Sequence, residues 1–109
     1  MKRWTLEGSI PRHLILALFR RQAREADVAV VEGVMGLFDG YDGASEAGST
    51  AQMAKWLGLP VLLVVDARAM ARSAAALVYG FASFDPALSL VGVVFNRIGS
   101  AAHLEFLEQ

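Results

Sequence analysis

Residues 26–49 read ADVAVVEGVMGLFDGYDGASEAGS, and the rest of the chain is organised around this stretch. The apolar run at residues 28–31 predicts a buried strand of a parallel sheet, which ends at the carboxylate of Glu32. The loop that follows is rich in glycine and carries three further acids, Asp39, Asp42 and Glu46. Glycine lets a backbone come close to a ligand, and open α/β sheets bind ligands at the carboxyl ends of their strands. The stretch therefore predicts a binding site.

Two further apolar runs, at residues 61–65 and 90–95, also predict buried parallel strands. Helices are expected around them, at residues 12–25, 48–57, 69–84 and 101–108. Ser49 or Thr50 can cap the second of these helices, and Gly58 can end it. The alternation of strands and helices predicts an α/β fold of three layers, with a parallel sheet and helices on its faces.

Each predicted strand is followed by a polar residue, namely Glu32, Asp66 or Asn96. Because the carboxyl ends of parallel strands meet at one edge of a sheet, we expect these three residues to lie close together. A carboxylate there can hold Mg²⁺ beside a phosphate chain, and an asparagine amide can read the edge of a base. Acids and amides also end strands simply because they are soluble. The three endings together with the acidic, glycine-rich loop favour a site.

The composition narrows the possible functions. The chain has 109 residues, a formal net charge of −1 and no cysteine, which argues against a nucleic-acid footprint, a thiolate metal site and a cysteine nucleophile. No apolar run approaches the roughly eighteen residues of a membrane span, so we expect a cytoplasmic protein with neither a membrane nor a nucleic-acid partner. Hydrophobic residues make up 55% of the chain, and three strands leave open sheet edges. Both features predict a larger sheet or a homo-oligomer.

Other polar residues carry less information. The phosphate-binding pattern G-x-x-x-x-G-K-[ST] does not occur in the sequence, so the residues predict the metal and base part of a nucleotide site without its phosphate part. A solvated helix face is the prediction for three clustered arginines, with phosphate binding as the alternative: Arg20, Arg21 and Arg24. His13 and His103 lack partners at metal-ligand spacing and are predicted to lie on the surface.

The run EGVMGLFDG at residues 32–40 resembles the signature of the cobyrinic acid a,c-diamide synthase family, including its hydrogenobyrinic acid sister. The likeness continues through SEAGSTA (45–51), LGLPVLLVVDA (57–67), MARSAAALVYGFASFDP (70–86) and GVVFNRIGSAAHLEFL (92–107). The resemblance implies an enzyme that uses ATP and glutamine to amidate the a and c acetate side chains of a corrin in cobalamin biosynthesis. It also implies an acyl-phosphate intermediate, a P-loop synthetase domain resembling dethiobiotin synthetase, and a glutaminase domain that supplies ammonia.

The resemblance assigns roles to individual residues. Glu32 falls at the position expected to bind the Mg²⁺ of ATP. Asp39 falls on the loop that supports the phosphorylated intermediate, with Asp42 beside it as a second catalytic candidate. Asn96, followed by Arg97, falls where the dethiobiotin-synthetase-like fold reads adenine. Glu46, Ser49 and Thr50 are expected near the substrate, and Tyr41 is the aromatic residue most expected to touch it because it lies among the loop glycines and acids.

The resemblance covers only part of such an enzyme. The sequence lacks the phosphate loop, the corrin-binding segment and the glutaminase with its cysteine, so residues 1–109 are expected to be one partial domain, the second half of the synthetase domain. We do not expect the segment to catalyse amidation alone. The alternative is a standalone, non-catalytic α/β module that associates with itself or with a partner.

Overall fold

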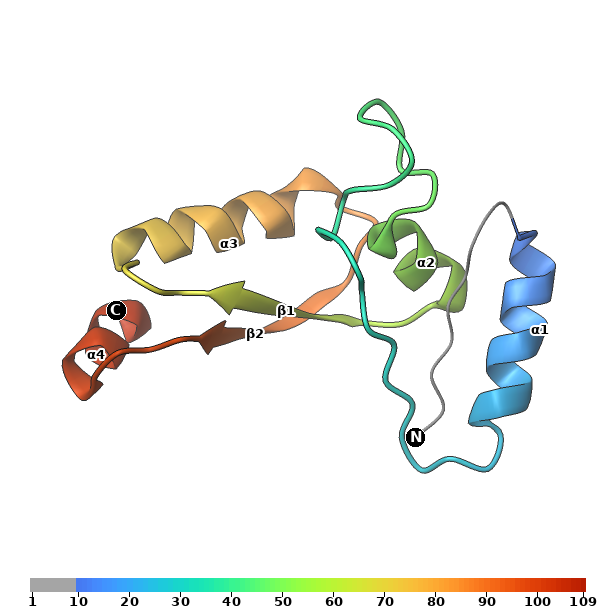
Figure 1. Ribbon diagram of the computed structural model, residues 1–109, viewed down its shortest axis with the longest axis horizontal. Coiled ribbons are helices and arrows are strands. Elements are labelled where there is room, and N and C mark those ends of the chain that lie inside the picture. The colour runs from blue at the N-terminus through green and yellow to red at the C-terminus, as the bar shows by residue number, and fades with distance from the viewer. Residues whose placement is uncertain (1–9) are drawn as a thin grey trace. The chain divides into compact units, whose positions relative to one another are not determined.

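The computed structural model describes residues 10–109, and the irregular lead-in expected over residues 1–9 lies outside the described residues (Figure 1). Its elements are, in chain order, α1 (Arg12–Ala23), α2 (Thr50–Leu57), β1 (Val61–Asp66), α3 (Arg72–Phe84), β2 (Leu90–Asn96) and α4 (Ala101–Glu108). The chain divides into two compact units, Met1–Gly58 and Leu59–Gln109. Within the part of the chain that is described, none of the helices is long and apolar enough to cross a membrane.

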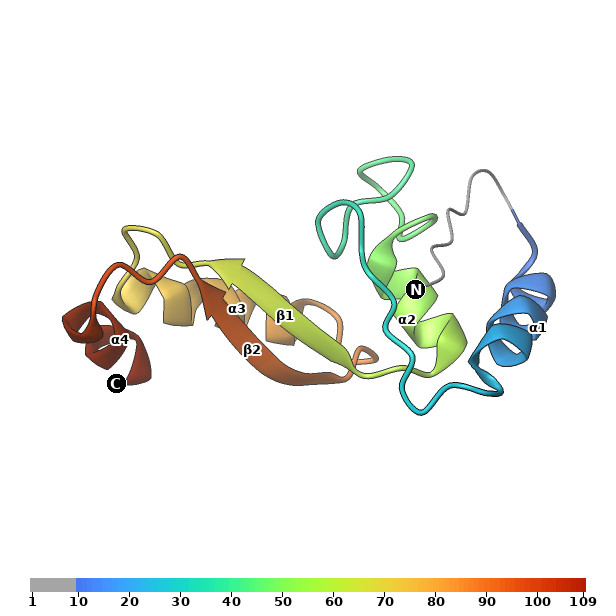
Figure 2. The same ribbon diagram turned by 60° about the horizontal axis from the view of Figure 1, so that its bottom comes forward.

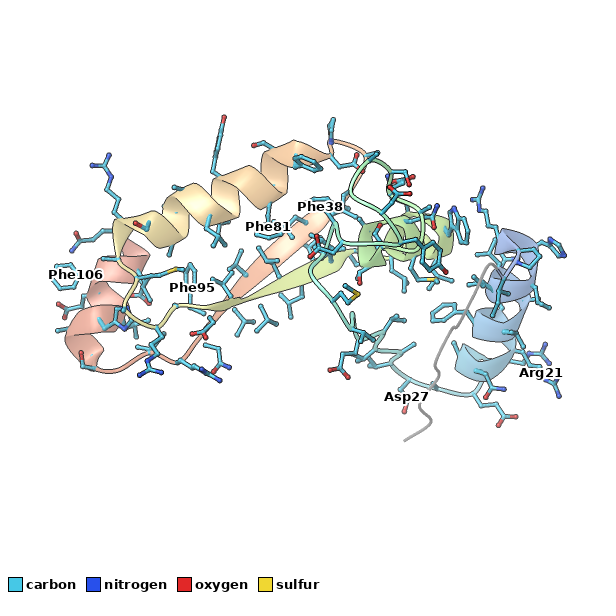
Figure 3. The ribbon with its side chains drawn as sticks, turned by 45° about the horizontal axis from the view of Figure 1, so that its top comes forward. Arg21, Asp27, Phe38, Phe81, Phe95 and Phe106 are labelled. Carbon is cyan, nitrogen blue, oxygen red and sulfur yellow. The ribbon has the colours of Figure 1, made fainter. Side chains whose placement is uncertain are left out.

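The first unit contains α1, a long irregular segment and α2. Helix α1 begins after Pro11, whose carbonyl oxygen accepts hydrogen bonds from the backbone N–H groups of Leu14 and Ile15. Ile15 is buried, and α1 packs against α2. Figure 3 shows Arg21 pointing outward from α1. Because Arg20, Arg21 and Arg24 are all exposed, the predicted solvated arginine face is confirmed.

Helix α2 has a defined beginning and end. The hydroxyl of Ser49 accepts a hydrogen bond from the backbone N–H of Gln52 at 3.0 Å, which caps the first turn. At the other end Gly58 adopts the left-handed conformation (φ 64°) and donates its N–H to the last turn of the helix. Both of these caps were predicted from the sequence, and both are confirmed.

The second unit is a β-α-β arrangement followed by α4. Strands β1 and β2 are parallel, and their register pairs Leu63 with Val93, Val65 with Phe95 and Asp66 with Asn96. Helix α3 covers one face of the sheet (Figure 2), and the side chains of Leu63 and Val65 are buried. Phe95 lies on the same side of β2, toward α3 (Figure 3). On the opposite face three apolar side chains are exposed, those of Leu62, Val64 and Val94.

The parallel sheet with flanking helices confirms the predicted α/β fold class, but one predicted strand is wrong. Residues 28–31 form no strand, and the sheet consists of β1 and β2 only. The side chains of Val28 and Val30 are 77% and 88% exposed. A parallel strand needs a neighbour that pairs with its backbone and a cover for its apolar side chains. In the described structure this run has neither, so its apolar composition alone does not make it a strand.

Candidate functional site

The carboxyl edge of the sheet brings together two of the three predicted polar endings. Asp66 and Asn96 are register partners, and the backbone N–H of Ala67 donates to the carbonyl oxygen of Asn96 at 2.9 Å. An Asp66 carboxylate oxygen lies 3.4 Å from a guanidinium nitrogen of Arg97, and both side chains are exposed. Glu32 follows an irregular segment rather than a strand, so the expectation that it ends a strand at this edge is wrong.

The β2–α4 turn (residues 97–100) follows Asn96. The side-chain oxygen of Asn96 accepts a hydrogen bond from the backbone N–H of Arg97 at 2.9 Å. Arg97 has a positive φ of 60°, a conformation that a residue with a side chain adopts only when its surroundings hold it there. Since Asn96 is exposed and its oxygen faces the backbone, its amide N–H₂ group is the part accessible to a ligand.

The β1–α3 turn (residues 67–71) resembles the β2–α4 turn in its hydrogen bonds and in its backbone conformation. The carboxylate of Asp66 accepts a hydrogen bond from the backbone N–H of Arg68 at 3.1 Å, and Met70 donates its N–H to the carbonyl oxygen of Ala67 at 3.0 Å. Ala69 also has a positive φ, of 57°. The two turns at the carboxyl edge of the sheet therefore each hold one non-glycine residue in a left-handed conformation.

His103 connects these two turns, and the sequence did not reveal it. Its Nδ1 atom accepts a hydrogen bond from the backbone N–H of Gly99 at 3.2 Å, and its Nε2 atom bonds to the carbonyl oxygen of Met70. Its own backbone N–H donates to the hydroxyl of Ser100, which caps α4. The predicted surface position holds for His13, whereas His103 is half-buried. The spacing Ser100-x-x-His103 could have indicated a helix start, but not the contact with Met70.

The remaining predicted site residues belong to the first unit. Most lie on the segment at residues 33–49, which we call the 33–49 loop. The backbone N–H of Ala51, in the first turn of α2, donates to the carbonyl oxygen of Leu37 at 2.9 Å. Leu37 and Ala51 are both buried, and Ser49 is only 2% exposed. The loop is thus anchored on the amino-terminal turn of α2.

The loop glycines allow close contacts within the chain. A Cβ atom on Gly33 would lie 2.8 Å from the hydroxyl oxygen of Thr50, and one on Gly48, whose φ is 78°, would lie 2.6 Å from the ring of Tyr41. A Cβ on Gly40 would clash with the carbonyl oxygen of Ala47, which accepts the backbone N–H of Tyr41 at 2.9 Å. These glycines therefore let the loop pack on itself and on α2.

Two of the loop acids have partners within the loop or on α2. The carboxylate of Asp42 accepts backbone hydrogen bonds from Ala44 (2.8 Å) and Ser45 (2.7 Å), and a third from the Ser45 hydroxyl (3.1 Å). These bonds, first those from the backbone of Ala44 and Ser45, hold the pKa of the Asp42 carboxyl below its usual value of 3.8. Glu46 forms an ion pair with Lys55 of α2.

Glu32 and Asp39 are exposed. The Asp39 carboxylate lies against Gly36, whose missing side chain leaves room for it. Because Gly33 touches Thr50, the chain immediately after Glu32 lies at the amino-terminal turn of α2. The structure thus places Glu32 and Thr50 near the same turn of one helix.

Within residues 10–109, no group of three or more histidines, aspartates and glutamates could hold a metal ion. Mg²⁺ in nucleotide sites is commonly held by one or two carboxylates together with phosphate oxygens and water. An exposed carboxylate such as that of Glu32 fits this mode of binding, whereas a metal cage made of protein ligands alone would not fit the described residues.

Comparison with known proteins identifies a matching family and several similar enzymes. A family described as an AAA domain matches residues 5–109. The cobyrinate a,c-diamide synthase of Syntrophotalea carbinolica is 59% identical over 91 residues, which are 84% of this chain and 20% of that protein. The enzyme of the same name from Salmonella typhimurium is 52% identical over 99 residues, 91% of this chain and 22% of the relative. The hydrogenobyrinate a,c-diamide synthase of Mycobacterium bovis is 50% identical over 104 residues, 92% of this chain and 23% of the relative.

No solved structure matches the chain significantly. The chain spans about a fifth of the length of these curated relatives. The relatives bear both names that the sequence motifs suggested, so the resemblance to the cobyrinic and hydrogenobyrinic acid a,c-diamide synthases is confirmed. Because the family match covers nearly all of its residues, the chain belongs to the AAA domain family.

Proposed function

We propose that the chain is part of a ligase of cobalamin biosynthesis that converts the a and c acetate carboxylates of cobyrinic or hydrogenobyrinic acid into amides. The observation that carries this proposal is the 50–59% identity to synthases of both names over 84–92% of the chain. ATP would be the energy source and glutamine the source of ammonia. The chain would act in the cytoplasm within a homo-oligomer, with the phosphate loop and the glutaminase supplied by other parts of the protein.

The chemistry explains why ATP is needed. A carboxylate resists attack by ammonia because its carbon is a poor electrophile. Transfer of the γ-phosphoryl group to a carboxylate oxygen releases ADP and gives an acyl phosphate. Ammonia then attacks the carbonyl carbon, phosphate leaves with the oxygen, and the nitrogen loses a proton to give the amide. Bound Mg²⁺ would offset the charge of the two anions that react, and Glu32 is the residue of this chain that we assign to hold it.

The adenine of ATP is assigned to the carboxyl edge of the sheet. The side-chain oxygen of Asn96 is engaged by the backbone of Arg97, so its N–H₂ group would donate to a ring nitrogen of the base. The Arg97 guanidinium, beside Asp66, would lie along the base or the ribose. This assignment uses the fixed backbone of β2 and its turn, which orients the amide before the nucleotide arrives.

The 33–49 loop is assigned to the substrate. Asp39 and Asp42 would orient the ammonia by accepting its N–H bonds, and the lowered pKa of Asp42 suits an acceptor that stays ionised. Tyr41, which is exposed, would lie along the corrin. Three other residues of this region are assigned near the substrate, although the first two also have structural partners: Glu46, Ser49 and Thr50.

The experiment that tests this proposal measures amidation by the protein that contains this chain, with cobyrinic or hydrogenobyrinic acid, ATP, Mg²⁺ and glutamine. Asn96→Ala should raise the KM for ATP roughly two- to tenfold, because one hydrogen bond to the base is lost. A second variant, Asn96→Asp, keeps the side-chain acceptor but loses the N–H₂ donors. It should therefore raise the KM for ATP as well. An unchanged KM in both variants would contradict the adenine assignment.

The alternative is a non-catalytic module that associates through apolar surface. The observation that favours it is the exposed apolar face of the sheet, formed by Leu62, Val64 and Val94. The two functions differ in their response to nucleotide. Binding of Mg-ATP that Asn96→Ala weakens supports the ligase. A tight dimer that ignores nucleotide, in a protein that forms no amide, supports the module.

A further inference from the structure

The two turns at the carboxyl edge of the sheet hold unfavourable backbone conformations. Ala69 in the β1–α3 turn and Arg97 in the β2–α4 turn both have positive φ, at 57° and 60°. Each such residue is strained, and strain of this kind persists only where surrounding contacts hold the backbone in place. Arg97 and its neighbour Asn96 are the residues assigned to the nucleotide base, so whatever holds this turn also sets the position of that assigned site.

His103 makes the contact that joins the two turns. One ring nitrogen accepts the backbone N–H of Gly99, two residues after Arg97, and the other bonds to the carbonyl oxygen of Met70, one residue after Ala69. The backbone N–H of Gly99 can only donate and the Met70 carbonyl can only accept. The ring is therefore neutral, with Nδ1 as the acceptor and the proton on Nε2.

Helix α4 supplies the rigid base for this contact. His103 lies in its first turn, where its backbone N–H donates to the Ser100 hydroxyl at 3.1 Å. The same residue is thus held by the helix cap and reaches both turns with its ring. The bond from Gly99 is local, since it spans four residues, whereas the bond to Met70 spans 33 residues. The longer bond is the one that fixes one turn relative to the other.

We propose that His103 is a positioning residue that fixes the β2–α4 turn against the β1–α3 turn and thereby orients Asn96 and Arg97 for the nucleotide base. This inference rests on the assignment of Asn96 and Arg97 under the proposed function. His103 itself would not touch the nucleotide. Its loss should therefore weaken ATP binding without changing the turnover of the saturated enzyme.

Two conservative variants test the two hydrogen bonds of the His103 ring separately. The amide nitrogen of a glutamine side chain reaches approximately as far as Nε2, and the amide oxygen of an asparagine approximately as far as Nδ1. His103→Gln keeps a donor for Met70, whereas His103→Asn keeps only an acceptor for Gly99. We expect His103→Asn and His103→Ala to raise the KM for ATP roughly three- to tenfold with kcat nearly unchanged, and His103→Gln to restore most of the affinity. His13→Ala, at an exposed position on α1, is the control and should change neither constant.

Steady-state kinetics of the protein that contains this chain give these constants, and Asn96→Ala is measured in parallel. If Asn96→Ala raises the KM but His103→Asn and His103→Ala do not, the positioning role is wrong while the adenine assignment stands. If Asn96→Ala leaves the KM unchanged, the adenine assignment is wrong and the inference falls with it. A ¹⁵N spectrum of His103 in the unaltered protein tests the contact without any substitution. A protonated Nδ1 would overturn the inference, and a proton on Nε2 alone would support it.

Discussion

At the scale of single residues, Asp42 organises the tip of the 33–49 loop. Its carboxylate accepts three hydrogen bonds from the two residues Ala44 and Ser45, which closes a tight turn around one side chain. An ionised carboxylate accepts these bonds more strongly than a protonated one, and for this reason the pKa of Asp42 lies below 3.8. The side chain therefore links the conformation of the loop to pH.

The sign of this linkage leads to the first prediction. A carboxyl group whose pKa is lower in the folded than in the unfolded state stabilises the fold fully above the unfolded value of about 3.8. That contribution disappears as the pH falls through the lower folded value. Asp42→Asn should remove this part of the pH dependence of stability, as measured by urea unfolding at a series of pH values. An Asp42 carboxyl that titrates at 3.8 or above in a ¹³C NMR titration would contradict it.

Ser49 is the second residue with a measurable local role. Its buried hydroxyl accepts a hydrogen bond from the backbone N–H of Gln52 at 3.0 Å, and Ser49 is the only buried polar residue within residues 10–109. Ser49→Ala should lower the free energy of unfolding by about 1 kcal/mol, because one N–H group at the start of α2 loses its partner. Ser83→Ala, at an exposed position within α3, is the matched control and should change it by less than about 0.5 kcal/mol. Equal effects of the two substitutions would contradict the capping role.

At the scale of elements, the 33–49 loop folds closely on itself because several of its positions have no side chain. Gly40 and Gly43 are three residues apart and differ sharply in their surroundings. A Cβ on Gly40 would clash with the Ala47 carbonyl oxygen and lie 3.1 Å from the backbone nitrogen of Ser49, whereas one on Gly43 would meet no atom within 4 Å. The same substitution can therefore be compared at a crowded and at an open position.

Gly40→Ala should lower the free energy of unfolding by roughly 1–3 kcal/mol, because the added methyl group forces the loop away from the amino-terminal end of α2. Gly43→Ala should leave it unchanged or raise it by up to about 1 kcal/mol, since alanine restricts the unfolded chain. Thermal or urea unfolding of both variants gives the comparison. A Gly40→Ala variant as stable as Gly43→Ala would mean that the loop does not pack on itself as described.

Some of the helices and strands could be predicted from the sequence, and one predicted strand was wrong. Strands β1 and β2 were predicted because each is a short, uninterrupted apolar run, and α2 because Ser49 and Gly58 mark its two ends. Residues 28–31 have the same apolar composition but no partner strand, and composition does not report whether a partner is present. Apolar runs and caps are local features, whereas strand pairing is a property of the folded chain.

The candidate site likewise contains one contact that could be predicted from the sequence and one that could not. The meeting of Asp66 and Asn96 could be predicted, because two neighbouring strands that are connected through a helix run parallel and end at the same edge of the sheet. The contact of His103 with Met70 could not, because it joins residues 33 positions apart through a single side chain. Likewise the number of loop glycines suggests a ligand, whereas only the folded structure shows that Gly33, Gly36, Gly40 and Gly48 each have a neighbour within the chain.

At the scale of the whole molecule, the chain accounts for about a fifth of the length of its curated relatives. One face of its sheet is apolar and exposed, through Leu62, Val64 and Val94. Exposed apolar surface of this kind is typical of a face that other protein covers. In the ligase that we propose, this segment would supply the Mg²⁺ ligand and the contacts to the base, and other segments would supply the phosphate loop and the glutaminase.

The most direct measurement is the turnover of the protein that contains this chain, with the corrin acid, ATP, Mg²⁺ and glutamine, before and after Glu32→Gln. We expect amide to form only when ATP is present. Glu32→Gln should lower kcat roughly 10²- to 10³-fold, because the charge that holds the metal ion is lost. Glu25→Gln, a change of the same charge at an exposed position just after α1, should leave kcat unchanged. Near-normal turnover of Glu32→Gln would contradict the metal assignment, and amide formation without ATP would contradict the proposed reaction.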